Sequence, residues 1–209
     1  MPATPETLEG RHVRLEPLTL EHVPALAAAA QGEEELFRWT TVPATPAAMR
    51  QYVETALRWA AEGTARAYAT VRRDDARVVG STRFFLLERW AWPDGHPNRE
   101  RHAYDGVEIG YTWLNSQAIR TRVNTEAKLL MLRHAFETWR VHRVCFHTDA
   151  RNERSRNALL RIGARFEGVL RAHRLAADLV PRDSARYSVI AAEWPVVSER
   201  LRARLDEGA

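Results

Sequence analysis

The stretch VEIGYTWLNSQAIRTRVNTEAK, residues 107–128, combines a strand, a basic loop and the start of a helix. Residues 107–114 are rich in β-branched and aromatic side chains, which predicts a strand. Residues 124–140 carry leucine and aromatic side chains at helical spacing, which predicts a helix. The loop between them contains Arg120 and Arg122. Backbone N–H groups in such a loop attract anions, as does a helix N-terminus, so the loop is a candidate anion site; arginines that only aid solubility are the alternative.

The rest of the sequence predicts one mixed α/β domain over residues 1–209. The predicted strands are residues 11–18, 65–73, 77–89, 107–114, 142–150, 165–176 and 182–193. The predicted helices are residues 19–30, 45–63, 124–140, 152–164 and 194–208. Thr45 and Asn152 are typical of helix N-caps, and Gly63 and Gly163 are typical of helix ends.

The composition is that of an ordinary globular domain, with 45% hydrophobic and 28% charged residues. No run approaches the roughly 18 apolar residues that span a bilayer, and we expect no signal peptide. One cysteine, Cys145, suits a reducing cytoplasm and is expected to be buried, while the histidines lack metal-ligand spacing. A local anionic ligand explains the net charge of +4, with acids interspersed among bases, at least as well as nucleic acid bound across the surface.

Several stretches resemble one known family. They are NERSRNALLRIGA (152–164), EGVLR (167–171) and YSVIAAEWP (187–195), taken together with residues 107–128. On these motifs the chain resembles the GNAT superfamily of N-acetyltransferases, and more narrowly the branch of the ribosomal-protein N-terminal (alanine/serine) acetyltransferases. The resemblance begins at LEGRHVRLEPL (8–18) and extends to the last predicted helix.

This resemblance implies a mostly antiparallel central sheet with one parallel pair at the coenzyme site, flanked by helices. It implies that acetyl-CoA is the cosubstrate and that its acetyl group passes to a primary amine by direct attack in a ternary complex. The acceptor would be a protein N-terminus or a small-molecule amine, and no metal is expected. The alternatives are a non-catalytic CoA-binding or sensor protein on the same fold, and a ribosome- or RNA-binding module.

The family's phosphate loop has the pattern Q/R-x-x-G-x-G/A, and Gln117 matches its first position. Arg120 and Arg122 stand where the glycines are expected. Glycine permits positive φ and close approach of the backbone to a pyrophosphate. Either guanidinium groups replace part of this backbone cradle or the loop has lost affinity for the coenzyme; we expect that binding is retained.

The resemblance also implies which residues bind the coenzyme. The pantetheine arm would lie along residues 110–114 and pair with their backbone as an added strand. The implied coenzyme-binding residues are Tyr111, Thr112, Trp113, Leu114, Gln117, Arg120, Thr121, Arg122, Val123, Asn124, Thr125, Asn152 and Ser155.

Glu108 is the leading candidate for the catalytic base, because members of the family often carry a glutamate near this place on the same strand. An ion pair with one of the many arginines is the alternative role. His173 is a second candidate, although an exposed or hydrogen-bonded histidine is the simpler interpretation. The ribosomal branch can use a glutamate one position further on, where this sequence has Arg174.

Many members of the superfamily use a tyrosine as the acid, and Leu159 stands at that position. Ser155 is the implied substitute, although a serine in a first helical turn often only bonds the backbone. The loop over residues 90–106 carries Trp90 and Trp92, which could form an acceptor flap, a dimer contact or a hydrophobic anchor.

Overall fold

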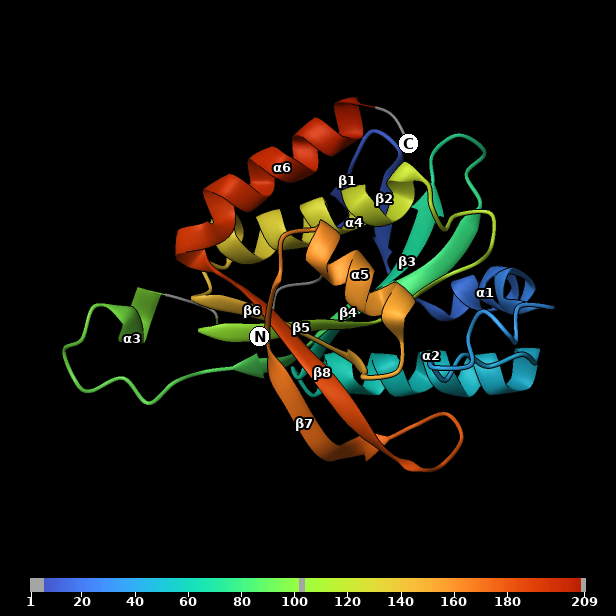
Figure 1. Cartoon of the computed structure of the whole chain (residues 1–209), viewed down its shortest axis with the longest axis horizontal. Helices are drawn as coiled ribbons and strands as arrows, with labels where there is room; N and C mark the ends of the chain where they lie inside the picture. Colours follow the sequence, from blue (N-terminus) through green and yellow to red (C-terminus); the bar gives the residue numbers. More distant parts are fainter. Residues whose placement is uncertain (1–5, 102–103, 208–209) are drawn as a thin grey trace.

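Eight strands form one sheet in the order β1-β2-β3-β4-β5-β6-β8-β7 (Figure 1). Their bounds are β1 Leu8–Glu9, β2 Val13–Pro17, β3 Ala65–Arg72, β4 Val78–Glu88, β5 Gly106–Leu114, β6 Arg143–Asp149, β7 Arg165–Leu175 and β8 Pro181–Ile190. The computed structural model describes residues 6–101 and 104–207. Neighbouring strands are antiparallel, except that β5 and β6 are parallel. The predicted fold class is therefore confirmed, and β1 is an addition that the sequence did not predict.

Helices cover both faces of this sheet. They are α1 Val23–Ala30, α2 Pro46–Ala61, α3 Asn98–Arg101, α4 Arg122–Arg133, α5 Glu153–Arg161 and α6 Trp194–Asp206. Figure 1 shows α4 and α6 together on one side of the sheet, with α1 and α2 beside each other on the opposite side. In the described part of the chain, no helix is both long and apolar enough to cross a membrane.

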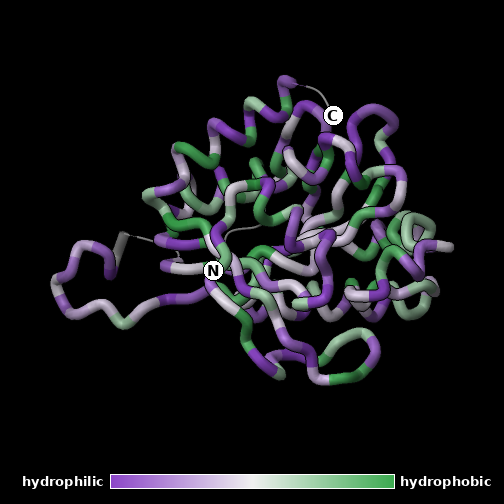
Figure 2. Tube along the Cα trace, viewed as in Figure 1, coloured by the Kyte–Doolittle hydropathy of each residue, from purple (hydrophilic) through white to green (hydrophobic). Residues whose placement is uncertain are grey.

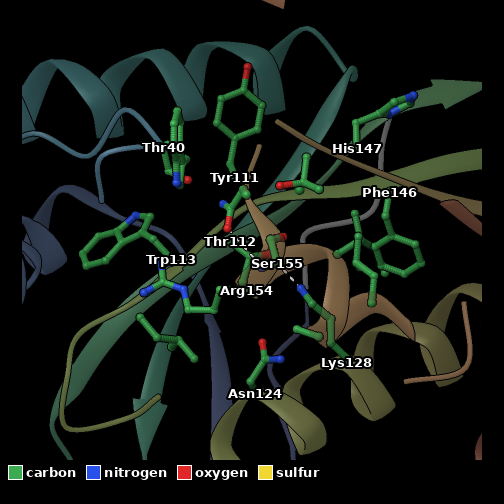
Figure 3. A pocket seen from close by; sticks show the side chains of 18 of the residues that line it. Thr40, Tyr111, Thr112, Trp113, Asn124, Lys128, Phe146, His147, Arg154 and Ser155 are labelled. Carbon is green, nitrogen blue, oxygen red and sulfur yellow. Dashed lines mark hydrogen bonds between the residues drawn. The ribbon is translucent and has the colours of Figure 1, made fainter. Parts of the chain in front are cut away.

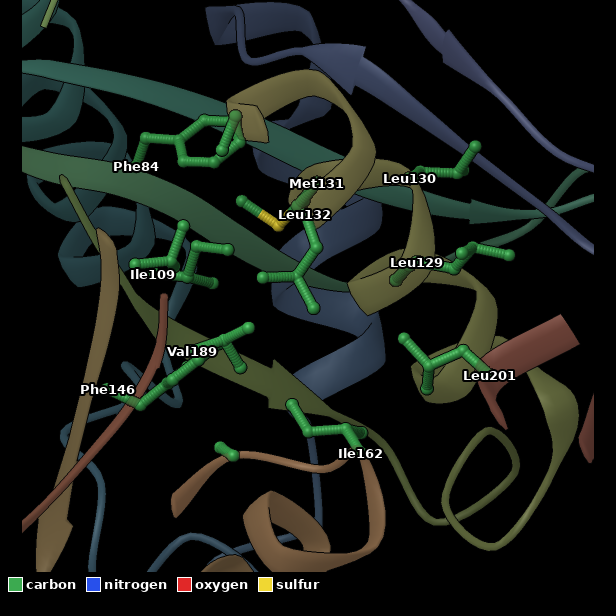
Figure 4. Packing of buried hydrophobic residues seen from close by; sticks show 14 of the residues in the cluster. Phe84, Ile109, Leu129, Leu130, Met131, Leu132, Phe146, Ile162, Val189 and Leu201 are labelled. Atoms are coloured by element: carbon green, nitrogen blue, oxygen red, sulfur yellow. The ribbon is translucent and has the colours of Figure 1, made fainter. Parts of the chain in front are cut away.

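The two faces of the sheet bury separate hydrophobic clusters, because side chains alternate between the faces along a strand. Ala67 and Ala69 on β3 pack with Met49 and Val53 of α2, whereas Tyr68 between them packs on the α4 side. Figure 4 shows part of the α4 cluster. Its labelled members include Phe84, Ile109, Met131, Leu132, Phe146, Val189 and Leu201. Along α6, hydrophobic and hydrophilic residues alternate in Figure 2, as expected for a helix with one buried side.

The predicted helix boundaries hold at α2 and α5 and differ at α4. Thr45 caps α2 by accepting a 3.3 Å hydrogen bond from the Ala48 N–H. The helix predicted to begin at residue 124 begins at Arg122, because Thr121 acts as N-cap and accepts from the Val123 N–H at 3.2 Å. Its end, predicted as α-helix to residue 140, is π-helical over residues 134–138.

Other boundaries also shift. The strand predicted to run to residue 193 ends at Ile190, and residues 191–193 form a 3₁₀ turn that leads into α6. The helix predicted from residue 19 opens with a 3₁₀ turn over Leu20–His22 before α1, with Thr19 as N-cap. Both are terminal turns, where 3₁₀ geometry is common.

A buried carboxylate fixes α4 to the turn between β1 and β2. Glu126 accepts hydrogen bonds from the backbone N–H groups of Arg11 (2.8 Å), His12 (2.6 Å) and Val13 (2.7 Å). Gly10 permits this approach, because a Cβ atom there would lie only 2.5 Å from the carboxylate. The N-terminal half of α4 is therefore held in place from outside the helix.

The parallel strands β5 and β6 pair over only a short distance. Glu108 is opposite Cys145 in the last pair, and in the described structure no further β5–β6 pair follows, although β5 continues to Leu114. Tyr111 adds a bulge with φ +50°, where the register between β4 and β5 shifts. The two strands consequently diverge, and this divergence opens the sheet next to the N-terminus of α4.

Candidate active site

A cavity of about 800 Å³ lies where β5 and β6 diverge. It is lined by β5, the loop before α4, the first turns of α4 and α5, and the segment over residues 37–41. Figure 3 shows Tyr111, Thr112 and Trp113 from β5 around the same space as Asn124 and Lys128 from α4 and Ser155 from α5. Volumes of this size are typical of sites for small molecules and cofactors.

Most of the predicted coenzyme-binding residues line this cavity. Those that do are Tyr111, Thr112, Trp113, Leu114, Arg120, Thr121, Arg122, Asn124, Thr125, Asn152 and Ser155. Two do not. Val123 packs into the hydrophobic cluster under the sheet, and Gln117 is exposed, with its carbonyl accepting from Arg72 Nη1 at 3.3 Å.

The basic loop retains a conformation that usually calls for glycine. Arg120 has φ +59°, in the left-handed region, at the first of the two expected glycine positions. A left-handed conformation costs a non-glycine residue on the order of 1 kcal/mol. Arg122 is instead the first residue of α4, so the second position requires no left-handed backbone. The substitution by arginine therefore leaves the loop in the expected conformation, with local strain at Arg120.

Positive charge gathers at the loop end of the cavity. Burial lowers the pKa of Arg154, and the like charges of Arg120 and Arg38 lower it further. Arg154 donates a 2.7 Å hydrogen bond to the Leu36 carbonyl, which turns its guanidinium toward this group. Arginines this close repel one another, so an anion between them would relieve the repulsion.

At the other end of the cavity, Glu108 forms a buried ionic cluster. Its carboxylate accepts from Arg174 Nη1 (3.3 Å) and Nη2 (3.0 Å), and Nδ1 of His147 lies 2.9 Å from its Oε2. The side chain of Glu108 is 3% exposed. Burial acts to raise the pKa of Glu108, but contact with His147 and the charge of Arg174 outweigh it, so that the pKa lies below its ordinary value.

His147 is a residue that sequence reasoning missed. It lines the cavity, and among the described residues neither of its buried ring nitrogens makes a hydrogen bond of good geometry, although Nδ1 lies in contact with the Glu108 carboxylate. The ring centroid of His173 lies 4.9 Å from that of His147, and burial, with the charge of Arg174, lowers the pKa of His173. In the structure Cys145 is the strand partner of Glu108, and His147 lies two residues further along β6 on the same face of the sheet.

Lys128, the last residue of the stretch 107–128, is buried in the structure. Its Nζ donates a 2.7 Å hydrogen bond to Oγ1 of Thr112, which lies 2.7 Å from Oγ1 of Thr82. Burial lowers the pKa of Lys128 to about 7. Helical spacing could have revealed this, since Lys128 precedes Leu132 by one turn on the buried side.

The first turn of α5 completes the wall of the cavity. Asn152 is the N-cap, and its Oδ1 accepts from the Ser155 N–H at 3.0 Å. Ser155 faces the cavity one turn before Leu159, which is buried and also lines it. The hydroxyl of Ser155 is therefore one polar group that α5 offers near the position of the family's tyrosine.

The tryptophan loop lies apart from this cavity. Neither Trp90 nor Trp92 lines it, and both donate to the carboxylate of Asp105, through the backbone N–H of Trp90 and Nε1 of Trp92, each at 2.7 Å. Trp92 also stacks on His96. Cys145 is buried, as expected. Within the described ranges, no group of three or more His, Cys, Asp or Glu side chains could hold a metal ion.

Comparison with known proteins gives the class to which this fold and cavity belong. The domain model described as acetyltransferase (GNAT) domain matches residues 12–165, and this chain belongs to the GNAT acetyltransferase family. Acetyl transfer from acetyl-CoA is the activity of that family. No curated protein sequence matches the chain significantly.

Solved structures agree with this assignment. A structure described as an acetyltransferase from T. thermophilus is 39% identical, covers 98% of this chain and 100% of its own, and has a TM-score of 0.78. A GCN5-related N-acetyltransferase from Brucella melitensis is 28% identical, with coverages of 96% and 85% and a TM-score of 0.81. Mycobacterium smegmatis RimJ, in complex with CoA-disulfide, shares the fold at 21% identity, with coverages of 91% and 88% and a TM-score of 0.75.

Proposed function

We propose that this protein is an N-acetyltransferase that transfers the acetyl group of acetyl-CoA to a primary amine by direct attack in a ternary complex. The observation that carries the proposal is the single cavity that joins the basic loop to the buried Glu108–His147 pair. One end has the charge to hold a phosphorylated coenzyme, and the other has groups that can take a proton. The acceptor is a protein N-terminus or a small-molecule amine.

The coenzyme binds with its phosphates at the loop end. Arg120 and Arg122 supply guanidinium contacts, and the first turn of α4 supplies free backbone N–H groups and the positive end of the helix dipole. The pantetheine arm then follows the edge of β5 that β6 leaves, over residues 110–114. A backbone N–H at this edge, next to the bulge at Tyr111, stabilises the oxyanion that develops on the thioester carbonyl.

The attacking amine loses its proton to the Glu108–His147 pair. Because its pKa lies below the ordinary value, Glu108 alone is a weak base. The Glu108 carboxylate instead lies 2.9 Å from Nδ1 of His147, and Nε2 on the other side of the ring accepts the proton. Histidine is the side chain that most often acts as a general base, and an α-amine, which titrates near 8, needs less help to lose its proton than a lysine does. On the coenzyme side, Ser155 binds the sulfur region from α5.

The test is acetyl transfer to a panel of primary amines and short peptides with free N-termini. We expect Glu108→Gln and His147→Gln each to lower kcat at neutral pH about 100-fold, with much smaller changes in KM. Glu167→Gln is the matched control, since Glu167 pairs with Arg143 outside the cavity and its loss should leave kcat within about twofold. An unchanged kcat in both test variants would make the pair structural. Binding of CoA without transfer to any amine would favour a sensor protein.

A further inference from the structure

The cavity contains one ionisable group to which the proposed function gives no task. Lys128 is 5% exposed and reaches from α4 into the wall that β5 forms (Figure 3). Its ammonium group donates a hydrogen bond to Thr112, and no carboxylate pairs with it in the described part of the chain. An ammonium group has three N–H donors, so further donors remain for a ligand in the cavity.

The side chains around Lys128 offer it no carboxylate with which to form an ion pair. The other titratable side chains that line the cavity are Glu108, Tyr111, His147 and a set of arginines, among them Arg154 on α5. Glu108 is already held by Arg174 and His147. Burying an ammonium without a counter-ion is costly, and burial is the only cause of its lowered pKa. A cationic acid that is neither paired nor solvated is suited to give up its proton.

We propose that Lys128 is the proton donor to the sulfur atom of coenzyme A as the thioester breaks. This inference rests on the proposed acetyl transfer. The amine nitrogen attacks the carbonyl carbon, the C–N bond forms, the C–S bond breaks, and its electron pair moves to sulfur. The ammonium of Lys128 passes one proton to the sulfur, which gives the free thiol and a neutral lysine. The amine proton leaves through His147, and solvent reprotonates Lys128 after the products depart.

Other groups in the cavity meet this need less well. Leu159, at the position of the family's tyrosine, carries no proton to give. A serine hydroxyl such as that of Ser155 can relay a proton but has none to lose at neutral pH. Lys128 and its hydrogen-bond partner Thr112 both line the same cavity as Ser155, and the ammonium group of Lys128 carries an acidic proton.

Because Lys128 is the only lysine of the chain, its protonation can be followed directly. Protein labelled with ¹³C-lysine gives one side-chain Cε signal, which is titrated in the complexes with CoA and with desulfo-CoA, which lacks the thiol. We expect the titration midpoint to differ by about one pH unit between the two complexes, because in the CoA complex Nζ and the sulfur share one proton and titrate as a coupled pair. Equal midpoints in the two complexes would overturn the proposal. Failure of both coenzymes to bind would overturn it together with the proposed function.

A variant gives a second, kinetic readout. Lys128→Met replaces the side chain by an uncharged one of similar length. We expect kcat to fall about 100-fold, the decline of kcat at alkaline pH to disappear, and the Kd for CoA to change less than threefold. Loss of coenzyme affinity with kcat preserved at saturation would assign Lys128 to binding and contradict the proposal. Wild-type kcat with an unchanged alkaline limb would contradict it as well.

Discussion

Substitution of the buried lysine makes a quantitative prediction about stability. Lys128 has its pKa lowered by burial from an ordinary 10.5 to about 7. In the unfolded chain the group holds its proton up to about pH 10.5, so between these values the unfolded state binds more protons. The free energy of unfolding must therefore rise with pH across this window. The full difference corresponds to roughly 5 kcal/mol, at about 1.4 kcal/mol per unit of pKa.

In Lys128→Met this contribution is absent. Between about pH 7.5 and about pH 9.5, the wild type should gain about 2.5 kcal/mol relative to the variant. Urea unfolding of both proteins at the two pH values measures how much more the unfolding free energy of the wild type rises than that of the variant. The contributions of other groups that titrate in this window cancel, because both proteins contain them. Parallel changes in the two proteins, within about 0.5 kcal/mol, would refute the lowered pKa and with it the account of the buried ammonium.

Two further predictions concern the loop and the anchor of α4. Arg120→Gly should be about 1 kcal/mol more stable to urea than Arg120→Ala, because only glycine relieves the φ of +59°, while both weaken CoA binding about tenfold in calorimetry. Equal stability would remove the strain argument. Glu126→Gln should lose about 2 kcal/mol of unfolding free energy, because its amide cannot accept from three backbone N–H groups. The exposed Glu54→Gln on α2 is the control, and an equal loss in both would contradict the anchoring role.

Much of the fold could be predicted from local patterns. Alternation and turn residues located β2 to β8 within a few residues but missed β1, and Thr45 and Asn152 were identified as helix caps because capping is a local interaction. The π-helical end of α4 could not be predicted, since the apolar spacing there suits an ordinary helix equally well. The start of α4 was misplaced because the capping role of Thr121 was overlooked.

The site divides in the same way. The basic loop was found because it lies in one continuous stretch of sequence, and Glu108 was found through the resemblance to the family. His147 was missed because only the parallel pairing of β5 with β6 brings it to Glu108. Lys128 was not singled out, and its hydrogen bond to Thr112 depends on the packing of α4 beneath β5. Arg174 seemed only a departure from the family, and its contact with Glu108 depends on the distant strand β7.

The central claim is that the arginine-bearing loop before α4 holds the phosphates of coenzyme A at the mouth of the cavity. Calorimetric titration of CoA, compared with pantetheine, which has the same arm without the nucleotide and phosphates, tests it most directly. The account predicts a micromolar Kd for CoA and at least about 100-fold weaker binding of pantetheine, since the charged contacts at the loop supply most of the affinity. Equal affinities, or no heat from CoA at high micromolar concentration, would contradict it.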